Sequence, residues 1–134
     1  MAQPYLPLPL VLIRQPFDDP DYLFEVKYDG WRCLAFSDQA GVRLVSRKGQ
    51  VFQRFATLAK DIRAALQGKE AIIDGEIVCL DSCGKPQFYE LLRNRRDCYL
   101  YAFDLLMLDG QDLREQPLIE RKQALRSIVP KDGC

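Results

Sequence analysis

The sequence predicts an α+β fold, in which helices pack on a mostly antiparallel sheet. Several short runs alternate apolar and polar residues and are separated by turns that contain glycine, as hairpin strands are. Two other stretches repeat apolar residues at helical spacing, and a long apolar run of strand character covers 98–108. Because strands outnumber helices in this pattern, we expect the sheet to organise the fold.

The first elements surround two glycine-containing turns. Strands are predicted over 22–27 and 31–37, on either side of Asp29-Gly30. A third strand is predicted over 42–46, behind the turn at 39–41. These three strands are expected to pair as antiparallel neighbours.

A helix is predicted next, ending at Gly68. Its apolar residues at helical spacing are Phe55, Leu58, Ala59, Ile62 and Leu66. The β-rich run "EAIIDGEIVCL" (70–80) follows and ends in the turn-like "DSCGKPQ". A strand over 70–80 is therefore expected beside the first hairpin.

The last third of the chain predicts a strand between two helices. Phe88, Leu91 and Leu92 mark a short helix, and Asp109-Gly110 ends the apolar run at 98–108. A final helix is predicted after Pro117. The residues expected along one of its sides are Leu118, Lys122, Leu125 and Ile128.

Length and composition indicate one soluble globular domain. The 134 residues are 48% hydrophobic and 28% charged, which is ordinary for such a chain. No run of about 18 apolar residues occurs, so no transmembrane helix and no membrane partner are expected. Prolines at 4, 7 and 9, with no basic start, favour an extended lead-in over residues 1–21 rather than a signal peptide. A cytoplasmic, intracellular location is expected.

The residue types exclude several kinds of chemistry. The sequence has no histidine, so a Ser-His-Asp triad, an imidazole base and a histidine-ligated metal are excluded. Its five cysteines are scattered, and Cys79 and Cys83 have no second pair that would complete a zinc site. Any catalysis must therefore use lysine, arginine, carboxylates or tyrosine, and reduced thiols are expected.

Glu25 and Lys27 share one face of the first strand, because side chains two positions apart point the same way. If that face meets solvent, they form an ordinary surface pair. If it lines a cleft, Lys27 is a candidate nucleophile.

Two later strands also carry polar residues. Asp74 and Glu76 share the face opposite Ile73, and the neighbours Phe103 and Asp104 are expected on opposite faces of their strand. Each of these features also occurs in ordinary structural strands.

Basic residues gather in one part of a chain whose net charge is zero. Between 43 and 69 a single acid, Asp61, accompanies seven basic residues: Arg43, Arg47, Lys48, Arg54, Lys60, Arg63 and Lys69. Such an excess either contacts phosphates or forms a solvated helix face and loop.

Four short motifs, taken in order, resemble those of the covalent nucleotidyltransferases, which are the polynucleotide ligases and mRNA-capping enzymes. Lys27-Tyr28-Asp29-Gly30, followed by Arg32, resembles the nucleophile motif K-x-D-G-x-R. Ser46–Gly49 resembles S-R-x-G, and Asp74–Glu76 resembles D-G-E. Phe103–Leu106 resembles the family's aromatic F-D strand.

Among these enzymes, the chain is most similar to ATP-dependent DNA ligases of the bacterial repair type. The segment "FDLLMLDGQDLREQPLIERKQAL" resembles theirs in its D-G turn and in the "ERK" that opens a helix. The resemblance runs from about Leu23 to Ile128 and implies a partial ligase adenylation fold, related to ATP-grasp. An mRNA-capping-type guanylyltransferase is the alternative enzyme.

The resemblance implies that Lys27 attacks the α-phosphate of ATP with Mg²⁺ present. The product is lysyl-AMP, used to seal nicks in duplex DNA. The residues implied to contact the nucleotide are Lys27 itself, Glu25 on the adenine side, Arg32 and Arg47 at ribose and phosphate, Glu76 at the ribose or the metal, and Phe103 stacked on adenine.

The same resemblance assigns residues to DNA and to the turn. Arg47 and Lys48 would contact DNA phosphates, and Asp29 and Gly30 would shape the turn that presents Lys27. Trp31 replaces the family's more frequent polar residue.

Residues 22–134 are expected to be the N-terminal part of an adenylation domain. Nothing after Arg126 resembles the later glutamate-glycine and K-x-K strands or the oligonucleotide-binding-fold domain. We therefore expect exposed strand edges that pair with a missing C-terminal portion or in a homodimer. A non-catalytic nucleotide- or DNA-binding remnant is the alternative to an enzyme.

Overall fold

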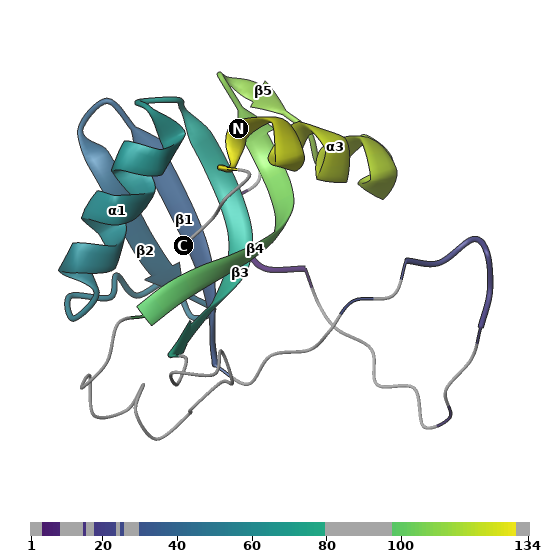
Figure 1. The fold of residues 1–134 in the computed structure, drawn as a ribbon, viewed down its shortest axis with the longest axis horizontal. Coiled ribbons are helices and arrows are strands. Elements are labelled where there is room, and N and C mark those ends of the chain that lie inside the picture. The colour runs from purple at the N-terminus through teal and green to yellow at the C-terminus, as the bar shows by residue number, and fades with distance from the viewer. Residues whose placement is uncertain are drawn as a thin grey trace.

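The computed structural model describes residues 4–8, 15, 18–23, 25, 30–79 and 98–130. They form an antiparallel sheet of five strands in the order β2-β1-β3-β4-β5 (Figure 1). The strands are β1 (Trp31–Asp38), β2 (Gly41–Ser46), β3 (Ala71–Cys79), β4 (Cys98–Leu108) and β5 (Gln111–Asp112). The helices are α1 (Ala56–Leu66) and α3 (Leu118–Ile128). The predicted α+β class is confirmed.

Most predicted elements begin and end within two residues of the observed ones. β5 was not predicted; Asp109 and Gly110 both have positive φ, at 48° and 83°, and turn β4 back into it. Of the strand predicted at 22–27, the described residues 22, 23 and 25 lie in no strand, and the others lie outside the described residues. The short helix predicted at Phe88–Leu92 lies wholly outside them. No described helix is long and apolar enough to span a membrane.

The main core lies on the face of the sheet that α1 covers (Figure 1). Its strand residues include Cys33, Ile73 and Leu105, and α1 adds Leu58 and Leu66. Burial raises the pKa of Cys33 to about 12, so its reactive thiolate is scarce at neutral pH.

Helix α3 packs against β4, with both apolar and charged side chains buried. Leu125 and Ile128 are buried as expected, but Leu118 is 38% exposed. Arg121 is buried in its place. Leu118 therefore lies in the helix as predicted, but its side chain is exposed.

An exposed ion pair between Asp112, the last residue of β5, and Arg114 leads to a prediction about pH. Arg114 donates from Nη2 to Asp112 at 2.7 Å, and these hydrogen bonds lower the pKa of Asp112 to about 2. Its contribution to stability is present above the unfolded pKa of about 3.9 and is lost as the pH falls toward 2. Carboxyl NMR should show a midpoint near 2 for Asp112 that rises in Arg114→Gln; a midpoint near 4 in both proteins would contradict the pairing.

Candidate functional site

The face of the sheet opposite α1, which we call the polar face, carries the charged residues of the motifs. Arg32 on β1 lies opposite Glu76 of β3. Its guanidinium binds Asp74, with Nε to Oδ1 and Nη2 to Oδ2 both at 2.7 Å. The side chains of Arg32 and Asp74 are only 8% and 1% exposed. The hydrogen bonds to Asp74 raise the pKa of Arg32, so the guanidinium stays charged.

Phe103 lies against this ion pair. The Cζ atom of Arg32 is 4.8 Å from the Phe103 ring centroid, a cation–π contact. The register pairs Asp74 with Asp104 and then Gly75 with Ala102, so Phe103 is the extra residue of a β-bulge. The bulge breaks the regular alternation from which Phe103 and Asp104 were expected to face opposite sides. It lets the aromatic ring join Asp74 on the polar face.

A second buried ion pair joins the site to α3. Arg121 donates to Asp104 from Nε at 2.9 Å and from Nη2 at 3.1 Å. Its Nη1 also donates to the Gln116 carbonyl at 2.7 Å. The strand residue next to Phe103 is thus held by α3 through a fork of hydrogen bonds.

Lys122, the next residue of α3, brings together groups that are far apart in the sequence. Its ammonium donates to the Glu25 carboxylate and to the Phe103 carbonyl. Partial burial, and to a lesser degree Arg126, lower the pKa of Lys122. Glu25 is therefore placed beside Phe103, as two residues of one site would be.

Sequence reasoning assigned no role to Arg121 or Lys122. The available signal was the position of Lys122 among the apolar residues of the predicted helix, where a surface lysine is unusual.

Two motif glycines allow close contact between strands. A Cβ on Gly30 would lie 2.1 Å from the carbonyl oxygen of Ile77, and one on Gly75 would lie 2.6 Å from that of Tyr101. A side chain at Gly30 would push the start of β1 away from β3, and a side chain at Gly75 would push β3 away from β4. Gly30 therefore has a packing role in addition to the role predicted for it in the turn.

The remaining predicted residues are either separate from this cluster or outside the described part of the chain. Arg47 and Lys48 are exposed in the loop after β2, which Gly49 closes through its N–H to the Ser46 carbonyl at 2.9 Å. The structure does not bring them into contact with Arg32 or Phe103. Lys27 and Asp29 lie outside the described residues.

Glu76 has the chemistry to assist a metal. It is half-buried on the polar face, near the ion pair of Arg32 and Asp74. Within the described ranges, no group of three or more metal-ligating side chains occurs.

Comparison with known proteins identifies the family to which the chain belongs. Residues 11–133 match the family model described as "ATP dependent DNA ligase domain". The chain is 36% identical over 123 residues to a DNA ligase of Pyrobaculum calidifontis, covering 81% of the chain and 21% of that protein. It is 32% identical over 138 residues to the bifunctional non-homologous end joining protein LigD of Bacillus subtilis, a match that covers 89% of this chain and 23% of that protein.

A solved structure supports the same family assignment. Mycobacterial DNA ligase D complexed with ATP and MES superposes with a TM-score of 0.69 at 35% identity, covering 77% of this chain and 35% of that one. The chain spans about a fifth of the length of the curated relatives it matches.

Proposed function

Because the chain belongs to the ATP-dependent DNA ligase domain family, we propose that residues 22–134 form the part of an adenylation domain that carries the nucleophile. The observation that carries the proposal is the convergence of motif residues on the polar face. Arg32, Glu76 and Phe103 come from three different strands of the sheet, and Glu25 joins them through Lys122. Their motifs were identified independently of this arrangement.

The proposed reaction transfers AMP to Lys27. The neutral amine attacks the α-phosphorus of ATP, the bond to the β-phosphate oxygen breaks, and pyrophosphate leaves. Because the ordinary pKa of lysine is about 10.4, the neutral amine is scarce at pH 7. A partly desolvated position near cations would increase that fraction.

Nucleotide recognition is proposed to use the polar face. Phe103 would stack on adenine, held by the Arg32 guanidinium on the ring and by Lys122 at its carbonyl. Glu25, oriented by Lys122, would contact the adenine edge. Arg32 is more a positioning residue than expected, because Asp74 occupies its Nε and Nη2 and leaves Nη1 for a ribose oxygen.

Glu76 is proposed to contact the ribose or to help hold Mg²⁺, which would supply charge stabilisation of the phosphates when bound. Arg47 and Lys48 would instead contact the phosphates of nicked duplex DNA, because exposed cations are enough to bind backbone phosphates. In this proposal the loop after β2 faces DNA and the polar face holds the nucleotide.

Incubation with α-labelled ATP and Mg²⁺, followed by denaturing electrophoresis, tests the proposal. We expect the label to remain on the chain after denaturation, since lysyl-AMP is covalent. Label from GTP in place of ATP would indicate the capping-type alternative. A folded chain that takes up neither label would be a non-catalytic binding remnant, and the adenylation proposal would be wrong.

A further inference from the structure

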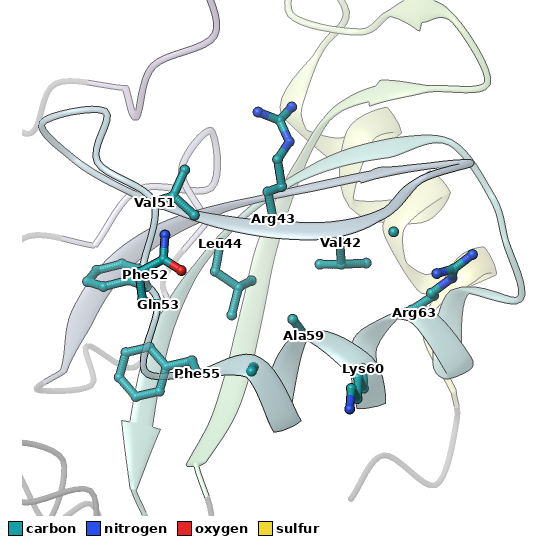
Figure 2. Close-up of a pocket in the computed structure, with 12 residues that line it drawn as sticks. Val42, Arg43, Leu44, Val51, Phe52, Gln53, Phe55, Ala59, Lys60 and Arg63 are labelled. Carbon is teal, nitrogen blue, oxygen red and sulfur yellow. The ribbon is translucent and has the colours of Figure 1, made fainter.

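A groove between α1 and β2 lies on the opposite side of the sheet from the polar face (Figure 2). Its volume is about 320 Å³. Val42 and Leu44 point from β2 toward α1, and the small residues Ala56 and Ala59 line the helix side. Two alanines on the groove side of α1 leave room for a side chain from outside.

The outer edge of β2 is paired along only half of its length. Beyond Leu44, the segment after the strand folds back, with Phe52 N–H donating to the Leu44 carbonyl at 2.8 Å. Backbone groups two positions apart point the same way, so the N–H and C=O of Val42 also face outward. Among the described residues, no backbone partner meets Val42 on that side. Such an edge can accept another strand.

The border of the groove is positively charged. Lys60 and Arg63 extend from α1, and Arg43 projects from the opposite side of β2 (Figure 2). Arg63 donates to the Gln39 carbonyl at 3.3 Å, which places its charge at the hairpin end. Among the described residues that line the groove, none is a carboxylate.

We propose that this groove binds an extended acidic segment of a partner protein, which adds to the sheet as a strand beside β2. Main-chain hydrogen bonds to Val42 would set its register. Alternate apolar side chains would pack over Ala56 and Ala59, and the acidic side chains between them would face Arg43. Lys60 and Arg63 would attract further carboxylates at the border.

The positively charged border and the apolar lining of the groove disfavour two other occupants. A second copy of the chain paired edge to edge would bring Arg43, Lys60 and Arg63 close to their own equivalents. A nucleic acid would use the cations, but would leave the apolar floor and the strand edge without complementary groups. The proposal does not depend on adenylation of Lys27.

Fluorescence anisotropy with the labelled peptide Glu-Val-Glu-Val-Glu-Val-Glu tests the proposal on the 134-residue chain. We expect saturable binding of this peptide and none of its Lys-Val counterpart. Val42→Pro removes an outward N–H that β1 does not use, and Ala59→Leu fills the floor with a good helix former. Each variant should weaken binding roughly fivefold or more, as the loss of one hydrogen bond or contact would.

Lys69→Glu is the matched control, since this exposed lysine lies outside the groove. It should bind the peptide as the wild type does, and circular dichroism should show all variants folded. Absence of peptide binding, or equal affinity in the wild type and both groove variants, would overturn the proposal. So would groove variants that weaken binding of a nicked duplex or abolish self-association while peptide binding is unchanged, because DNA or a second copy would then be the occupant.

Discussion

Replacing Lys27 by alanine is expected to remove the covalent label from α-labelled ATP, by about 10³-fold or more. In the proposed reaction the nitrogen of the ε-amine forms the bond to phosphorus, so no neighbouring residue would substitute for it. Lys27→Arg should be equally inactive, because a guanidinium keeps its charge but does not deprotonate in proteins. The two variants together separate nucleophilicity from positive charge.

Lys69→Ala is the control for labelling, since Lys69 is exposed and lies between α1 and β3, outside the polar face. It should be labelled as the wild type is. Label retained by both Lys27 variants would show that another residue is the nucleophile. Proteolysis and mass spectrometry of the labelled wild type should place the AMP group on the peptide that contains Lys27.

Local patterns in the sequence predicted the elements well. A period of two placed Asp74 and Glu76 together on one face, and helical spacing predicted α1 to within a residue at its start. Both patterns depend only on neighbours within a few positions, where backbone geometry is fixed. The same reasoning predicted the end of β4 at Asp109.

Contacts between residues far apart in the sequence were harder to predict from the sequence. Arg32 and Asp74 are 42 positions apart, and Lys122 and Glu25 are 97 apart, so their pairing depends on strand register and helix docking. The bulge that turns Phe103 toward Arg32 leaves no distinct mark in an apolar run. A single sequence gives residue types and faces, whereas partners across the sheet emerge only from the fold.

The second large effect is expected at the ion pair between Arg32 and Asp74. Arg32→Leu should lower the free energy of unfolding by about 3–5 kcal/mol, because it leaves the 1%-exposed Asp74 carboxylate charged and without its partner. Urea denaturation monitored by circular dichroism measures the loss. The slope with urea should stay unchanged if only stability is affected.

Two comparisons within the chain test that cause. Arg114→Leu removes an equally short ion pair to Asp112, but that pair is exposed, so its loss should be much smaller. The double variant Arg32→Leu, Asp74→Leu replaces both charges by apolar groups and should recover much of the stability lost in Arg32→Leu. Equal losses in Arg32→Leu and Arg114→Leu would contradict a burial effect.

The double variant also separates the two roles proposed for Arg32. If Arg32 only supports the sheet and Phe103, the folded double variant should still label with ATP, at a raised concentration for half-maximal labelling. If its Nη1 contacts the ribose, a stable double variant should label far more slowly at saturating ATP as well. Because stability and labelling are measured on the same protein, loss of the fold is not mistaken for loss of a nucleotide contact.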